Sequence, residues 1–261
     1  MKHDLRIIAI LVLLFLAAQF IGLTIVQRLT EKELAFGIQR PKLDQERSFI
    51  FVFLIIIFVT VIALIIARFN AIRIFKVWFF ISLALVLTIA ISAFTHQYIA
   101  LFLALLVTYF KVVKYNTIIH NIGELFVYGG LAAIFVPVFS IFSISILLLL
   151  ISVYDIFAVW KTKHMIRLAR FQSKLKIFAG LLIPYGKKKA AILGGGDIGF
   201  PLIFGGVVVQ KMGAIGLIIP FTASLSLLGL LIYGKENKFY PAMPFLAAGC
   251  FVGYFLVRFF V

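Results

Sequence analysis

Long apolar segments separated by short polar or charged ones repeat along the whole chain. A helix needs about 20 apolar residues to cross the hydrocarbon core of a bilayer. Pro137 and the adjoining Phe139-Ser140 step divide one run that is too long for a single crossing, so the pattern predicts nine spans rather than eight. The nine predicted spans are Leu5–Val26, Phe49–Ala67, Ile74–Phe94, Tyr98–Val113, Leu125–Phe139, Ile141–Trp160, Ala190–Gln210, Met212–Tyr233 and Ala242–Phe260.

The composition agrees with a membrane protein and excludes a soluble one. Hydrophobic residues make up 64% of the 261 residues and charged residues 13%, whereas a soluble domain has about 45–50% apolar and about 25% charged residues. The net charge of +16 is of the kind found in nucleic-acid-binding proteins. However, the apolar fraction is too high for that class and no nucleic-acid motif is present, so we expect no nucleic-acid partner.

The basic residues indicate the orientation in the membrane. Of the 25 Lys and Arg residues, 18 fall on the side of the N-terminus and 7 on the other. Basic residues collect on the cytoplasmic side, so the sequence predicts a multi-pass protein of the cell membrane with a cytoplasmic N-terminus and a C-terminus outside. In the basic connection 161–189, apolar residues recur at helical spacing, which favours an amphipathic helix on the anionic inner leaflet; they are Leu168, Phe171, Leu175 and Phe178. A basic linker without fixed structure is the alternative.

The nine acidic residues fall into two groups. Seven lie at termini, in loops or at the ends of predicted spans, where water can reach them: Asp4, Glu31, Glu33, Asp44, Glu46, Glu124 and Glu236. Asp155 and Asp197 lie inside strongly apolar segments on consecutive predicted spans. A carboxyl group at such depth costs roughly 2.5–3.5 kcal/mol and usually faces a protein interior or a water-filled cavity. These two acids are therefore the candidate functional residues.

Neither Asp155 nor Asp197 has a basic residue in its own apolar segment. The least costly arrangement brings the two carboxyl groups together with one proton between them, because like charges in contact resist ionising together. One group can then act as a general base on water while the other donates a proton to a carbonyl oxygen, as in aspartic peptide hydrolysis. Two alternatives remain: carboxyl groups hydrogen-bonded to backbone, and proton- or cation-coupled transport.

Three consecutive glycines, Gly194-Gly195-Gly196, directly precede Asp197. Glycine weakens a helix by about 1 kcal/mol per residue and lets backbone approach closely. The pattern predicts a loosened turn where the facing helix or an extended substrate approaches Asp197, with Pro201 as a further break. Gly195 and Gly199 also form a small-xxx-small face, for which helix packing is the simplest interpretation.

Three short motifs stand in order along the chain: Tyr154-Asp155, Gly194-Gly195-Gly196-Asp197 and Pro241-Ala242-Met243. They resemble the Tyr-Asp, Gly-x-Gly-Asp and Pro-Ala-Leu motifs of the presenilin and signal peptide peptidase family of intramembrane aspartyl proteases. They fall in the family's order on the sixth, seventh and ninth predicted spans. Each motif alone is weak, but together they extend the resemblance over the whole chain. Met243 departs from the usual Leu, a change that is conservative in size and polarity.

The resemblance implies an all-α polytopic membrane protein, a presenilin-like bundle of nine transmembrane helices. It divides the chain into a six-helix scaffold at 1–160 with the first catalytic Asp, a basic cytoplasmic connection at 161–189 and a three-helix part at 190–261. It makes Asp155 and Asp197 the catalytic pair. The residues that it implies for substrate binding are Tyr154, Gly194, Gly196, Pro241, Ala242 and Met243.

The Pro-Ala-Met segment has a conformational reason to matter. Pro241 and Pro244 disfavour helical backbone at Tyr240 and Met243, so we expect a short extended segment before the last span. An extended segment can pair with an unwound substrate as an added strand. The alternative is a proline-marked helix start.

The implied partners are the lipid bilayer and substrates that are single-span membrane proteins or signal-peptide-like segments, and the resemblance implies no cofactor and no metal. The predicted orientation is that of presenilins, which implies substrates with their N-terminus outside.

A single Cys250, no His-Glu-x-x-His motif and no histidine deep in a predicted span exclude zinc and serine proteases. Prepilin peptidases share Gly-x-Gly-Asp but cut at the cytoplasmic face. A transporter or channel using the same two acids is the main alternative, although we find no repeated halves.

Overall fold

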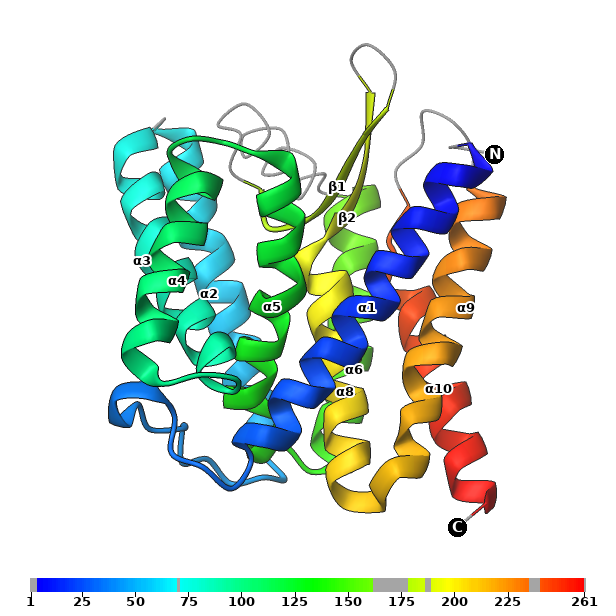
Figure 1. Cartoon of the computed structure of the whole chain (residues 1–261). Helices are drawn as coiled ribbons and strands as arrows, with labels where there is room; N and C mark the ends of the chain where they lie inside the picture. Colours follow the sequence, from blue (N-terminus) through cyan, green and yellow to red (C-terminus); the bar gives the residue numbers. More distant parts are fainter. Residues whose placement is uncertain (1–3, 70, 162–177, 186–188, 235–239, 261) are drawn as a thin grey trace.

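The structure, a computed structural model, describes residues 4–69, 71–161, 178–185, 189–234 and 240–260. In these ranges the chain folds into nine long helices and one two-stranded hairpin (Figure 1), which confirms the predicted all-α polytopic class. The helices are α1 (Leu5–Leu29), α2 (Ser48–Arg68), α3 (Ile72–Ser92), α4 (Gln97–Val112), α5 (Thr117–Phe135), α6 (Ile141–Ile156), α8 (Gly195–Met212), α9 (Ile218–Tyr233) and α10 (Met243–Phe260); the strands are β1 (Gly180–Tyr185) and β2 (Lys189–Gly194).

Seven segments of the described chain are long and apolar enough to cross a membrane. One of these segments, Gly195–Tyr233, contains both α8 and α9, which the 3-10 segment Gly213–Leu217 separates. The remaining helix, α4, is shorter at 16 residues. The helices of the described residues therefore match the nine predicted spans in number and order.

Helix α5 begins earlier than the sequence predicts. It starts at Thr117 instead of Leu125, and Asn116 caps it by accepting hydrogen bonds from the backbone amides of Ile118 and Ile119. Such a cap satisfies amides that would otherwise lack a partner at the start of a helix. The predicted start is wrong because polar side chains in the first two turns of α5 lower the local hydropathy.

The break between α5 and α6 lies where Pro137 predicts it. Val136–Val138 form one 3-10 turn, since proline cannot donate the backbone hydrogen bond that would continue a helix. Ser140 then caps α6 through a reciprocal pair of side-chain to backbone hydrogen bonds with Ser143. The long apolar run is thus two helices.

The predicted seventh span begins in a strand. Residues Lys189–Gly194 form β2, which pairs antiparallel with β1 from Gly180↔Gly194 to Tyr185↔Lys189. Gly180 has φ +146°, and a Cβ there would lie 2.2 Å from the carbonyl oxygen of Leu193, so glycine is required. The prediction is wrong for these residues because hydropathy alone does not distinguish a short buried strand from a helix.

The amphipathic helix predicted in the connection 161–189 falls mostly on residues 162–177, outside the part of the chain that the structure describes. Two other parts of that connection are described. Phe157–Lys161 form one π-helical turn after α6, and residues 180–185 form β1. The connection therefore contains strand as well as the predicted basic segment.

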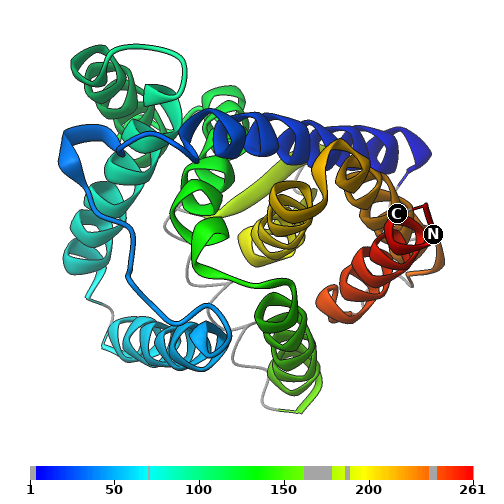
Figure 2. The ribbon, with the colours of Figure 1, turned by 90° about the horizontal axis from the view of Figure 1, so that it is seen from below.

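Helix α8 lies in the middle of the bundle, with α1, α5, α6, α9 and α10 around it (Figure 2). Its buried side chains, Phe204 among them, share one hydrophobic core with Phe15 of α1, Leu148 of α6 and Leu246 of α10. Apolar side chains also face outward, as Phe58 of α2 does with 64% of its surface exposed. An apolar exterior is expected of helices that contact lipid. The central position of α8 brings the residues before and after Asp197 into contact with several helices.

Candidate active site

Asp155 lies in the last turn of α6, and its side chain is buried, with 8% of the residue exposed. Its Oδ2 atom accepts a hydrogen bond of 3.1 Å from the backbone N–H of Met243, and the backbone N–H of Ala242 donates to the same carboxyl group. Both amides stand at the start of α10, where backbone N–H groups have no partner within the helix. The Pro-Ala-Met segment therefore meets Asp155 through its backbone.

Asp197 lies in the first turn of α8, three residues after the N-cap Gly194. The backbone N–H of Gly194 donates to its carboxyl group, and a Cβ added at Gly194 would lie 3.1 Å from Oδ2. The N-terminus of a helix favours a carboxylate, because the free backbone N–H groups carry partial positive charge. A side chain at position 194 would crowd this carboxyl group.

The three glycines do not loosen a span from within, as the sequence suggested. Gly194 ends β2 and caps α8, and Gly195 and Gly196 are the first residues of that helix. Pro201 is accommodated inside α8, where the N–H that proline lacks leaves the carbonyl of Asp197 without its usual helical partner. The expected loosened turn is thus a strand-to-helix junction.

Asp155 and Asp197 come from helices that pack against each other, and they lie close enough for their charges to interact. One carboxyl group is held by the amides of α10 and the other by the start of α8. Among the described residues, the partners given for these two carboxyl groups are backbone amides and each other, with no cation. Such a pair favours a shared proton, because two negative charges side by side would repel.

The other predicted site residues lie around this pair. Tyr154 is half-buried beside Asp155, and its hydroxyl hydrogen-bonds Thr60 of α2. Gly196 is exposed, and Pro241 is buried. Met243 is already helical, as the first residue of α10, so the expectation that Pro244 keeps it out of a helix is wrong. Proline is tolerated at the second helical position, because a backbone N–H there would have no acceptor within the helix.

Sequence reasoning missed Gln19. This residue of α1 is buried, and its Nε2 atom donates to the carbonyl oxygen of Ile198, the residue after Asp197, at 2.9 Å. A polar amide inside an apolar span is costly unless it finds a partner. Gln19 was therefore a detectable signal in the first predicted span.

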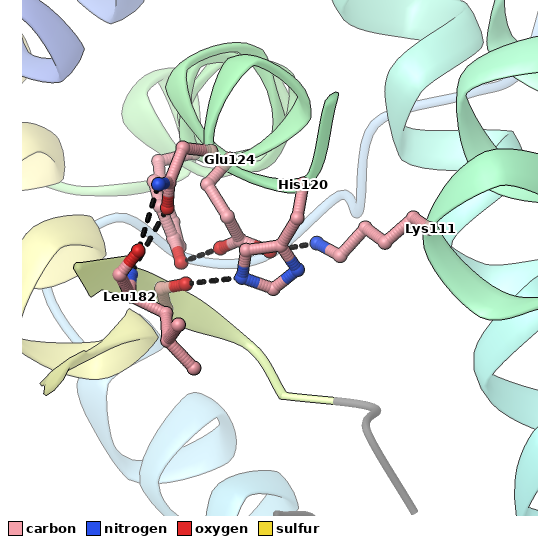
Figure 3. Close-up of polar contacts among 7 residues, drawn as sticks. Lys111, His120, Glu124 and Leu182 are labelled. Atoms are coloured by element: carbon pink, nitrogen blue, oxygen red, sulfur yellow. Dashed lines mark hydrogen bonds and ion pairs between the residues drawn. The ribbon is translucent and has the colours of Figure 1, made fainter. Parts of the chain in front are cut away.

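Sequence reasoning also misplaced a second polar cluster, on α4 and α5 (Figure 3). Lys111 and Glu124 form an ion pair in which each side chain is only 1% exposed, and the hydroxyl of Tyr128 donates to the other oxygen of Glu124. Glu124 was expected at the end of a span within reach of water. This expectation is wrong, because α5 begins earlier than predicted and buries Glu124 against α4.

His120, in the first turn of α5, is also fully buried. Its Nε2 atom donates to the carbonyl oxygen of Gly180 at 2.8 Å. The partner is a strand carbonyl, not a serine hydroxyl. In the part of the chain that the structure describes, no group of three or more His, Cys, Asp or Glu residues is placed to hold a metal ion.

Comparison with known proteins agrees with this geometry. The family model described as signal-peptide peptidase, presenilin aspartyl protease matches residues 12–261. No curated protein sequence matches the chain. The fold is similar to that of a presenilin family intramembrane aspartate protease solved in space group C222. The TM-score is 0.68, the sequence identity is 21%, and the match covers 97% of this chain and 99% of that chain. A P2 form of such a protease gives TM-score 0.67, 20% identity and coverage of 96% and 97%. At these identities the structures establish the fold, and the family rests on the family model.

Proposed function

The chain belongs to the signal-peptide peptidase and presenilin family of aspartyl proteases, and from this we propose that Asp155 and Asp197 are its catalytic pair. The protein is an integral membrane protease that hydrolyses peptide bonds within the bilayer. The observation that carries the assignment is the approach of two carboxyl groups, the buried Asp155 of α6 and the partly buried Asp197 of α8, to within reach of each other's charge.

The two carboxyl groups share one proton and hold a water molecule between them. The carboxylate takes a proton from the water while the water oxygen attacks the carbonyl carbon of the substrate. The protonated carboxyl group donates its proton to the carbonyl oxygen. The resulting gem-diol then loses a proton to a carboxylate, the amide nitrogen gains one, and the C–N bond breaks. Each acid thus serves as base and as acid in one turnover.

The remaining predicted residues shape the approach of the substrate. Ala242 and Met243 hold the carboxyl group of Asp155 through their amides. Pro241 and Ala242 precede α10 in non-helical backbone, against which an unwound segment of substrate can lie. Tyr154, Gly194 and Gly196 form the other walls, with glycine leaving room beside Asp197.

Substitution of each acid by its isosteric amide tests the assignment. We expect Asp155→Asn and Asp197→Asn each to abolish cleavage of a single-span peptide by purified protein in lipid vesicles, because an amide cannot exchange the proton. Asp44→Asn, in an exposed loop, is the matched control and retains cleavage. An aspartyl-protease transition-state inhibitor blocks the wild type. If the vesicles cleave nothing but move protons or cations in an Asp-dependent way, the transporter alternative replaces this assignment.

The N-terminus lies in the cytoplasm and the C-terminus outside. The excess of basic residues on the N-terminal side supports this orientation. The start of α1 and the end of α10 lie at opposite ends of the bundle, which supports termini on opposite sides of the membrane (Figure 1). Substrates then have their N-terminus outside. Protease protection of a terminal tag in sealed vesicles tests the orientation, and a C-terminal tag on the cytoplasmic side would overturn it.

A further inference from the structure

One face of α5 is polar although the helix is buried. His120, Glu124 and Tyr128 are spaced four residues apart, so their side chains lie on one face of the helix. They reach toward β1, α4 and the start of α8. The proposed catalytic reaction uses none of these three residues.

Tyr128 contacts the helix turn that carries Asp197. A Cβ added at Gly195 would lie 3.0 Å from the hydroxyl oxygen of Tyr128, and one added at Gly199 would lie 3.7 Å from its ring. The two glycines flank Asp197 on α8, and the small-xxx-small face that they form packs on this tyrosine. Tyr128 is also close enough to Asp197 for an electrostatic interaction.

The position of Tyr128 is fixed by a chain of polar contacts (Figure 3). Its hydroxyl donates to Glu124, and Glu124 is neutralised by Lys111 of α4. A buried carboxylate without a cation is costly, so Lys111 keeps Glu124 available as an acceptor. The chain of contacts runs from α4 through α5 to the start of α8.

The same helix also holds β1, the partner of the strand β2 that leads to Asp197. The side-chain amide of Asn121 donates to the carbonyl of Leu182 and accepts from its N–H, at 2.8 and 3.0 Å. His120 holds Gly180, and the backbone N–H of Gly195 donates to Ala179 just before β1. Helix α5 therefore contacts both β1, through His120 and Asn121, and the first turn of α8, through Tyr128.

We propose that Tyr128 is a positioning residue for Asp197, and that the buried Lys111–Glu124 ion pair fixes Tyr128 for this role. This inference rests on the proposed function of Asp197. Tyr128 does not touch the scissile bond. Its ring and hydroxyl hold the first turn of α8 so that the carboxyl group of Asp197 keeps its distance to Asp155.

Kinetics of four variants test the inference on purified protein in lipid vesicles with a single-span peptide. A displacement of about 1 Å in a catalytic group can cost about a hundredfold in rate. We expect Tyr128→Phe and Glu124→Ala to lower kcat roughly ten- to a hundredfold with little change in KM. The double variant Lys111→Met/Glu124→Gln keeps a neutral acceptor for Tyr128, and we expect it to recover most of the kcat lost in Glu124→Ala.

Tyr254→Phe is the matched control. It removes the hydroxyl of a tyrosine that packs on Phe204 of α8, outside the polar cluster, and leaves kcat unchanged. If Tyr128→Phe and Glu124→Ala shift only the unfolding temperature, or if the double variant recovers nothing, the inference is overturned. Retained cleavage in Asp197→Asn would instead overturn the proposed function, and inactive aspartate variants beside a fully active Tyr128→Phe would overturn this inference alone.

Discussion

Glu124 and Asp155 are both buried carboxyl groups of one bundle, but their partners differ in kind. Glu124 meets a lysine and a tyrosine hydroxyl, which together satisfy both of its oxygens. Asp155 meets backbone amides and faces another acid. A carboxylate with a cation beside it is stable as an ion and suits a positioning role. A carboxyl group facing a second one depends on a proton, which suits acid and base chemistry.

The largest expected effect separates the two sites by activity. Asp155→Asn lowers cleavage by about 10⁴-fold or more, as loss of a central catalytic group does. The fold is retained because Asn has the same shape and its side-chain oxygen can still accept the hydrogen bond from Met243. Cleavage and thermal unfolding of the same preparation measure both quantities. If the Asp155→Asn protein unfolds at a much lower temperature than the wild type, Asp155 has a structural role like that of Glu124.

The second prediction separates the sites by stability. Lys111→Met leaves Glu124 buried without a cation, and removing one partner of a buried ion pair costs about 3–5 kcal/mol. Chemical unfolding in detergent measures the loss. Glu124→Gln added to Lys111→Met should restore most of it, because no buried charge remains. An unchanged stability of the single variant would show that the pair is not desolvated.

Gly195 and Gly196 test the contact between Tyr128 and the first turn of α8, where the polar cluster meets the proposed active site. Gly195→Ala places a methyl group 3.0 Å from the Tyr128 hydroxyl and 3.3 Å from the carbonyl of Ala179, so we expect a loss of about 1–3 kcal/mol in stability and reduced cleavage. Gly196→Ala is the control, since its methyl group would meet only Phe200 at 3.5 Å. Equal effects of the two substitutions on unfolding would contradict the close contact with Tyr128.

The smallest expected effect is at Gln19. Gln19→Leu removes the hydrogen bond to the carbonyl of Ile198 by replacing the polar side chain with an apolar one of similar size. A typical buried hydrogen bond contributes about 0.5–1.5 kcal/mol, so the unfolding midpoint should fall slightly. Cleavage should change less than in Tyr128→Phe, because Gln19 contacts the backbone beyond Asp197 and not the turn before it. A larger fall in cleavage than in Tyr128→Phe would shift the positioning role from α5 to α1.

Particular residues show how far the sequence could lead. The depth of Asp155 and Asp197 was visible because a carboxyl group inside an apolar segment is costly wherever that segment packs. Pro137 marked the break between α5 and α6 because the missing N–H of proline acts locally. Glu124 was assigned to water because it stands at the end of a hydrophobic window, and only its contact with the buried Lys111 makes its burial tolerable.

The sequence by itself determined the all-α membrane class, the order of the long helices, the two acids at depth and the family motifs. These depend on hydropathy, on turn residues and on the cost of a buried charge, which act over a few neighbouring positions. The tertiary structure alone decided that Gly180–Tyr185 and Lys189–Gly194 pair as antiparallel strands, that Lys111 meets Glu124, and that Tyr128 packs on the glycines beside Asp197. Such contacts join residues far apart in the chain, and they arise from how the helices pack around α8 rather than from any local pattern.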